Sequence, residues 1–170
     1  MIPTLTTDRL TLRAPERRDF DAYAAMLADP RTSYMGGPFG RAQAWAEFNQ
    51  IIAAWHLDGA GGWIITDGTD TLLGEIFVTQ NQHFPEPELG WTLTRDAEGH
   101  GYAQEAARAV LAWYWANTDA TTLVSYVTPT NARSAVLAEK LGAHPDDDAP
   151  RPDGENAQDT TVYRHMRGAA

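Results

Sequence analysis

The most informative stretch of the chain reads Glu98-Gly-His-Gly-Tyr-Ala-Gln-Glu-Ala106. Its two glycines have no Cβ, so the backbone can curl there and approach a ligand closely. The apolar spacing that follows is helical, and the unpaired N–H groups at a helix start, with the helix dipole behind them, suit a pyrophosphate. A plain glycine turn that binds nothing gives the same pattern, so the turn alone leaves both interpretations open.

Two common nucleotide motifs do not fit this stretch. The dinucleotide-binding fingerprint requires a third glycine and a βαβ series, whereas the strands that flank this turn read as a meander. A nucleotide P-loop requires Gly-Lys-Ser or Gly-Lys-Thr, and neither follows the glycines. The ligand class therefore has to be argued from the wider context of the turn.

Helical periodicity and breakers divide the rest of the chain. Apolar residues at spacings of three and four predict four helices, which cover Pro15 to Asp29, 42–57, 102–117 and 131–140. Two segments rich in glycine, proline or acidic residues, 31–40 and 145–158, are expected to be loops. Alternating or β-branched runs predict strands at 6–13, 62–66, 71–78, 88–93, 122–128 and 160–166.

Composition limits the class of protein. A length of 170 residues predicts a single domain over 1–170, and no run of about 18 apolar residues is present to span a membrane. The chain has no cysteine, which excludes disulfides, thiolate zinc sites and a cysteine nucleophile. The first residues lack the basic start and apolar stretch of a secretory signal, so a cytoplasmic location is expected.

The net charge of −10 bears on the partners of the protein. Nucleic-acid binding needs clustered Lys and Arg to neutralise phosphates, so a nucleic-acid partner is not expected. The acidic balance mildly favours a cationic partner, although a surface that only aids solubility explains it equally well.

The order of the predicted elements resembles the GNAT superfamily of N-acetyltransferases over nearly the whole chain. The family's pyrophosphate motif is Gln or Arg, two residues, Gly, one residue, then Gly or Ala, and Glu98, Gly101 and Ala103 occupy these positions. The run from Gly99 to Ala106 resembles the RimJ/RimL-like branch of ribosomal-protein N-acetyltransferases. Three further segments resemble that branch, namely Thr7-Asp-Arg-Leu-Thr-Leu-Arg13, Glu88-Leu-Gly-Trp-Thr-Leu93 and Asn131-Ala-Arg-Ser-Ala-Val-Leu-Ala-Glu-Lys-Leu-Gly142.

The resemblance implies an α/β (α+β) fold with a mixed, mostly antiparallel central sheet flanked by helices, and acetyl-CoA as co-substrate without a metal. It also implies that two central strands splay apart, which leaves backbone groups around Trp91 to Thr94 free to pair with pantetheine. Glu98 departs from the family's Gln or Arg, and a carboxylate beside a pyrophosphate should cost affinity unless it points to solvent. The cofactor-binding residues implied are Trp91, Leu93, Glu98, Gly99, His100, Gly101, Tyr102, Ala103, Asn131 and Ser134.

Acetyl transfer to an amine needs a proton acceptor, an oxyanion donor and a donor for the leaving thiolate. The resemblance points to Glu88 as the base, with Glu75 and Glu86 as rivals. Glu88 can equally be an exposed strand carboxylate or part of a cross-strand ion pair without a catalytic role. Ser134 is the candidate near the sulfur, because the tyrosine that many members carry one turn later is Ala138 here. Asn131 and Ser134 can equally be explained as helix-capping residues.

These observations lead to one expectation and two alternatives. The expected enzyme passes the acetyl group of acetyl-CoA to a primary amine, either a protein N-terminus or a small amine, by direct attack in a ternary complex. The branch also suggests a homodimer. The alternatives are a catalytically inactive acyl-CoA-binding or sensor module and a nucleotide-binding oxidoreductase.

Overall fold

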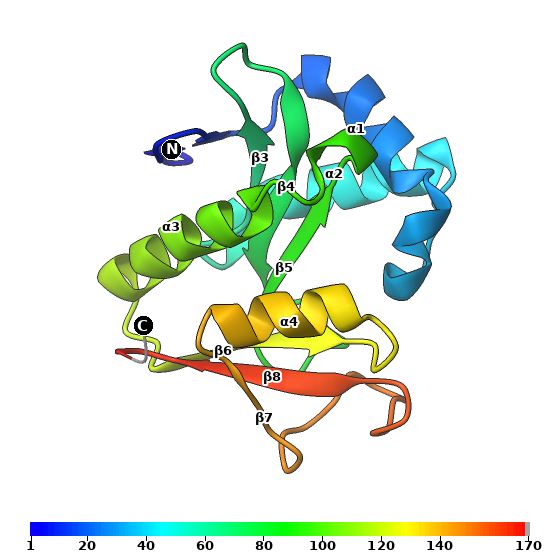
Figure 1. Ribbon diagram of the computed structural model, residues 1–170, viewed down its shortest axis with the longest axis vertical. Coiled ribbons are helices and arrows are strands. Elements are labelled where there is room, and N and C mark those ends of the chain that lie inside the picture. Colours follow the sequence, from blue (N-terminus) through cyan, green and yellow to red (C-terminus); the bar gives the residue numbers. More distant parts are fainter. Residues whose placement is uncertain (169–170) are drawn as a thin grey trace.

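The computed structural model describes residues 1–168 and is built on one eight-stranded sheet (Figure 1). Its strand order is β1-β2-β3-β4-β5-β6-β8-β7, and each neighbouring pair is antiparallel except β5 with β6. The expected mixed, mostly antiparallel sheet is therefore confirmed. The strands are β1 (Leu5–Thr6), β2 (Thr11–Arg13), β3 (Gly62–Thr66), β4 (Leu72–Thr79), β5 (Glu88–Leu93), β6 (Thr122–Val127), β7 (His144–Pro145) and β8 (Thr161–Met166).

Within residues 1–168, four α-helices and three short 3-10 helices flank the sheet. Their bounds are η1 (Arg17–Asp19), α1 (Phe20–Leu27), η2 (Pro30–Met35), α2 (Arg41–Leu57), η3 (Arg95–Ala97), α3 (Tyr102–Asn117) and α4 (Ala132–Lys140). No helix among residues 1–168 has the length and apolar character that crossing a membrane requires.

The two faces of the sheet carry separate apolar cores. On one face α3 buries Ala106, Val110 and Tyr114 against side chains of β3, β4 and β5. On the other face α1 and α2 pack around Ile64, with Tyr23 and Phe48 between them. Alternation along β4 sends Ile76 to the first core and Phe77 to the second, as a strand covered on both sides requires.

Two predictions about the N-terminal third were wrong. The single strand predicted over 6–13 is a small hairpin, in which β1 pairs with β2 and Leu5 lies opposite Leu12. The Thr7 hydroxyl accepts the Leu10 N–H at 3.0 Å and so supports the bend. The predicted loop 31–40 contains η2, which Asp29 caps by accepting the Arg31 N–H.

Candidate active site

The sheet opens between β5 and β6. The Val124 N–H donates to the Pro87 carbonyl at 3.1 Å, and Glu88 with Val124 is the residue pair that aligns these strands. At the next step the Ser125 hydroxyl, a side chain, donates to the Leu89 carbonyl at 2.7 Å. Figure 1 shows the result, with the antiparallel strands β3, β4 and β5 standing upright in the view and β6 and β8 lying across below them.

Backbone groups of β5 beyond this point face the opening. The Thr94 N–H donates to Leu73 of β4 at 2.8 Å, whereas the Pro87 carbonyl accepts from β6. Because backbone groups of a strand alternate between its two neighbours, the N–H and C=O groups of Trp91 and Leu93 point toward β6. Free backbone groups are predicted around Trp91 to Thr94. Those of Trp91 and Leu93 face the opening, whereas the Thr94 N–H is already paired with β4.

The glycine turn lies at the start of α3 and has the conformation that its sequence predicts. Gly99 and Gly101 both have φ of 80°, in the left-handed region that favours glycine. A Cβ on Gly101 would lie 3.6 Å from the nearest side-chain atom, so the backbone angle rather than crowding requires glycine there. The first bond of the helix runs from Glu105 N–H to the Gly101 carbonyl at 3.1 Å. The N–H groups of Tyr102, Ala103 and Gln104 therefore have no partner within the helix.

Arg9 braces this turn from the N-terminal hairpin. Its Nε donates to the Glu105 carboxylate at 2.7 Å, and its Nη1 donates to the His100 carbonyl at 3.0 Å. The guanidinium also lies 4.7 Å from the centre of the Tyr102 ring. Thr7 donates its hydroxyl to the same Glu105 carboxylate at 2.5 Å. The segment around Arg9 and the glycine turn, about 90 residues apart in the sequence, are thus in direct contact.

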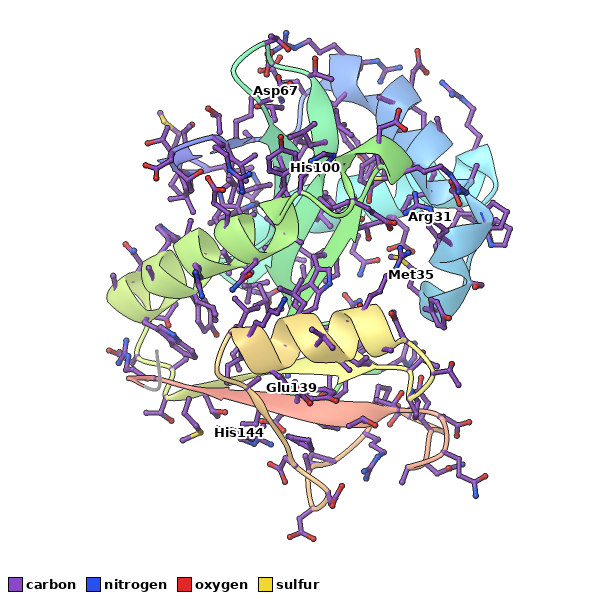
Figure 2. The ribbon with its side chains drawn as sticks, viewed as in Figure 1. Arg31, Met35, Asp67, His100, Glu139 and His144 are labelled. Atoms are coloured by element: carbon purple, nitrogen blue, oxygen red, sulfur yellow. The ribbon has the colours of Figure 1, made fainter. Side chains whose placement is uncertain are left out.

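Glu98 does not point freely to solvent. A solvent-facing side chain is the arrangement in which a carboxylate beside a pyrophosphate would cost no affinity. One carboxylate oxygen pairs with the Arg31 guanidinium of η2, and the other lies 2.5 Å from Arg133 Nη1 of α4. Figure 2 shows Arg31 and Met35 on the η2 side of the space above α4. The negative charge of Glu98 is therefore matched by two guanidiniums at the mouth of the opening.

A second group of side chains lines the α1/α2 face of β4 and β5. Strand register places Glu88 opposite Thr79, Gly90 opposite Phe77, and Glu75 opposite Thr92. The Phe77 ring covers Gly90 so closely that a Cβ there would lie 2.1 Å from its Cζ. Gly90 therefore leaves room for the Phe77 ring between the positions of the two carboxylates.

Glu88 sits where β5 and β6 part. The residue is partly buried, and burial raises the pKa of its carboxyl group from 4.5 to about 7. The Tyr126 backbone N–H acts in the opposite direction, and the Glu155 carboxylate adds to the rise. A carboxylate with a pKa near neutrality can both accept and release a proton at physiological pH.

The two rival carboxylates have other surroundings. Glu75 is 1% exposed and accepts a hydrogen bond from the Tyr23 hydroxyl at 2.8 Å, and burial raises its pKa to about 7. The four-residue offset along β5 puts it about 13 Å from Glu88. Glu86 is bound by both terminal nitrogens of Arg164, at 2.7 and 2.8 Å. Arg164 thus occupies both oxygens of the Glu86 carboxylate.

The predicted pair on α4 is placed as a helix cap. Asn131 is the N-cap, and its side-chain oxygen accepts the Ser134 N–H at 3.3 Å. Asn131 is thus confirmed as the cap of α4. Ser134 lies one turn before Ala138, which packs on Val127 of the sheet, so both belong to the sheet-facing side of the helix.

Sequence reasoning missed the residues that shape this opening. Ser125 also lies 3.1 Å from His165 Nε2, where burial lowers the pKa of the imidazole to about 4. A buried serine within an apolar strand is the sequence signal that could have marked the site. Arg31 and Arg133 gave no periodic or motif signal, because their common partner is far from both along the chain.

The sequence of residues 9–144 matches the acetyltransferase (GNAT) domain. This chain belongs to the GNAT family of acetyltransferases. It is therefore an acetyl-CoA-dependent acetyltransferase, and the nucleotide-binding oxidoreductase alternative is wrong.

Three GNAT proteins illustrate the range of similarity. The acetyltransferase from Agrobacterium tumefaciens str. C58, known from its crystal structure, is 42% identical, with a TM-score of 0.91 over 98% of this chain and 95% of that one. N-acetyltransferase p20 of Bacillus licheniformis, itself uncharacterized, is 31% identical over 81% of this chain and 80% of its own length. RimL, a ribosomal L7/L12 α-N-protein acetyltransferase crystallised with coenzyme A, is 15% identical with a TM-score of 0.76 over 96% and 98% of the two chains, and shares the fold.

The residues present fit the acetyl-CoA of a GNAT enzyme. The turn offers unpartnered helix N–H groups with two left-handed glycines, as a pyrophosphate requires. The outward backbone groups of Trp91 and Leu93 offer the edge of a strand that an extended pantetheine chain can join. Within residues 1–168 no group of three His, Asp or Glu side chains is arranged to hold a metal ion.

Proposed function

We propose that the chain is an N-acetyltransferase in which a primary amine attacks the acetyl group of acetyl-CoA directly, within a ternary complex. The observation that carries the proposal is the opening between β5 and β6, which has the glycine turn at one end and Glu88 at its closed end. We take residues 1–170 to act as one catalytic domain. Acetyl-CoA, when bound, supplies the acetyl group as an activated thioester.

The residues of the chain divide the remaining tasks. The turn from Glu98 to Ala103, including Gly99, His100 and Tyr102, binds the pyrophosphate through backbone N–H groups, and Trp91 and Leu93 bind the pantetheine arm through theirs. Glu88 accepts a proton from the ammonium group of the acceptor, directly or through water. The hydroxyl of Ser134 donates to the leaving sulfur. Asn131 fixes the start of α4, and so positions Ser134.

Glu88 is the better proton acceptor of the two carboxylates with raised pKa. Glu75 is almost wholly enclosed, and the Tyr23 hydroxyl occupies one of its oxygens. Glu88 is less enclosed as a residue than Glu75 and lies at the point where the strands part, so we place the approach of the acceptor there. We assign Glu75 the role of holding Tyr23 and β4 in place.

The acceptor is a primary amine that arrives protonated. The Glu155 carboxylate lies near enough to Glu88 to raise its pKa, so this corner favours a cation over an anion. The RimJ/RimL-like segments of the sequence and the common fold with RimL support a protein N-terminus as acceptor. The net charge of −10 supports a small cationic amine equally well.

A non-catalytic acyl-CoA sensor is the second candidate, since the family's tyrosine acid is replaced by Ala138 and Asn131 serves as a cap. A measurement of turnover distinguishes the sensor from the enzyme. We would titrate the protein with acetyl-CoA by calorimetry and then follow thiol release with a panel of N-terminal peptides, polyamines, aminoglycosides and amino acids. Turnover on one class establishes the enzyme and its acceptor, binding without turnover on any class favours the sensor, and absence of binding would sink both.

A further inference from the structure

Three segments meet at the Glu98 carboxylate. Arg31 comes from η2, Glu98 from the glycine turn, and Arg133 from the first turn of α4. Each guanidinium pairs with a different oxygen of the carboxylate. The three charged groups thus form a bridge across the mouth of the opening, beside the N–H groups of the turn.

Arg31 is oriented independently of Glu98. Asp29 accepts the Arg31 backbone N–H at 3.0 Å and its Nε at 3.1 Å, which fixes both ends of the side chain. Arg95 Nη2 lies 3.2 Å from both oxygens of Asp29 and helps to hold it. The terminal nitrogens of Arg31 then reach Glu98 and the Leu93 carbonyl, the latter at 3.4 Å. They are therefore directed into the opening by the fold.

Arg133 is held differently. Its side chain is 80% exposed, and Glu98 is its salt-bridge partner among the described residues. A guanidinium held by one exposed ion pair is free to change partners at little cost, because such pairs contribute about 0.2–1 kcal/mol. Glu98 therefore keeps Arg133 close to the turn without fixing it there.

The charge balance of the bridge favours an anion. Counted with Asp29 and Arg95, the cluster has three guanidiniums and two carboxylates, which leaves a net charge of +1 next to unpaired helix N–H groups. Guanidiniums that bind a carboxylate can bind a phosphate oxygen with the same geometry. A pyrophosphate at the turn is thus placed to compete with Glu98 for both arginines.

We propose that Glu98 is a resting partner for Arg31 and Arg133, and that the two arginines transfer to the cofactor's pyrophosphate when it binds. Arg31 and Arg133 then bind the phosphates of the cofactor. The strength of their ion pairs with Glu98 determines how easily the pyrophosphate displaces the carboxylate. This inference rests on the proposed function, because it requires the cofactor at the glycine turn. It also explains how a carboxylate is tolerated where the family usually has Gln or Arg.

The test is a set of dissociation constants measured by calorimetry with three ligands, namely coenzyme A, dephospho-coenzyme A and pantetheine. Glu98→Gln frees both arginines, so it should tighten the two pyrophosphate ligands by about two- to fivefold. Arg31→Gln and Arg133→Gln should each weaken them by about three- to tenfold. Pantetheine, which has no pyrophosphate, should bind all variants alike.

The Arg41–Asp21 ion pair provides matched controls. Both side chains are exposed, at 66% and 83%, and belong to the outer ends of α1 and α2. Arg41→Gln and Asp21→Asn change the net charge by the same amounts as the test variants, so they report any long-range effect of charge alone. Thermal melting of each variant without ligand verifies folding, and Glu98→Gln should melt slightly lower because the bridge is lost.

The outcomes separate this inference from the proposed function. If coenzyme A binds the wild type but Glu98→Gln binds it equally or more weakly, the exchange is wrong and the enzyme proposal stands. Unchanged affinity in both arginine variants, or equal shifts for pantetheine, would overturn it as well. If the wild type binds no coenzyme A, the proposed function itself fails.

Discussion

The Ser125 hydroxyl donates to the Leu89 carbonyl oxygen at 2.7 Å, at the last point of contact between two strands that then diverge. A backbone N–H would occupy this place in a regular parallel ladder. The side chain thus ends the ladder without leaving the carbonyl unpaired. His165 is attached to the same hydroxyl, 3.1 Å from its Oγ, so the junction is a small buried polar network.

Ser125→Ala should destabilise the protein, because it leaves a buried carbonyl and a buried imidazole nitrogen without partners. The expected loss in free energy of unfolding is about 1–3 kcal/mol, measured by urea denaturation. Ser125→Thr keeps the hydroxyl and is the control. A Ser125→Ala protein as stable as the wild type would show that the hydroxyl does not hold the junction.

Gly101→Ala should weaken coenzyme A binding by disturbing the glycine turn. A left-handed φ costs a residue with a Cβ about 1–2 kcal/mol, and the turn can relieve this only by rotating its N–H groups away from the ligand. Gly59→Ala is the matched control, since Gly59 has φ of 74°, and a Cβ added there would have no other atom within 4 Å. Calorimetry should show reduced affinity for the first variant alone, and equal affinities would argue against the turn as the binding site.

Glu88→Gln should spare cofactor binding and remove the acidic limb of the pH–rate profile, in which the rate rises with pH. A base works in its deprotonated form, and the pKa of Glu88 is raised to about 7, so the wild-type rate should climb with pH through about 7 and then level off. The variant should be slower by about 100-fold at pH 8 and flat across this range. Glu139→Gln, an exposed change on α4, is the control. An unaltered profile in Glu88→Gln would eliminate Glu88 as the base.

Glu75→Gln should make stability less sensitive to pH. Burial raises the pKa of Glu75 from 4.5 to about 7 in the folded state, so the folded protein binds this proton more tightly than the unfolded chain does. The stabilisation is complete below pH 4.5 and is lost as pH rises to about 7. The variant has no such loss, so its stability relative to the wild type should rise over this range by on the order of 1–3 kcal/mol. Parallel unfolding curves at pH 4 and pH 8 for the two proteins would contradict the assignment.

Local pattern predicts much of this fold and only part of its site. Residues 102–117 have a helical apolar face and a glycine start, and α3 has these bounds because both signals agree. The strand predicted over 6–13 failed because the alternation of Leu10 and Leu12 says nothing about the bend that Thr7 supports. The glycine turn is likewise predicted correctly, because Gly99 and Gly101 lie directly before the helical pattern.

What sequence could not supply is pairing between distant segments. The point where β5 and β6 part is marked by the Ser125 hydroxyl, and the strand pattern does not show which carbonyl that hydroxyl binds. Glu98 looks unfavourable in its motif because the two arginines that match its charge lie in η2 and α4. Candidate bases are equally hard to rank from sequence, since burial and not residue type separates Glu75 from Glu88.

The brace from Arg9 has a consequence for transplanting the glycine turn. Residues 98–106 look like a portable module, a short contiguous peptide that could be grafted onto the start of another helix. In this protein the first turn of that helix is held through Glu105 by a hairpin 96 residues earlier in the chain, and loop closure over such a length costs entropy that only the complete fold repays. A graft would carry the glycines and leave their support behind, so a designer who borrows the turn has to borrow the hairpin with it.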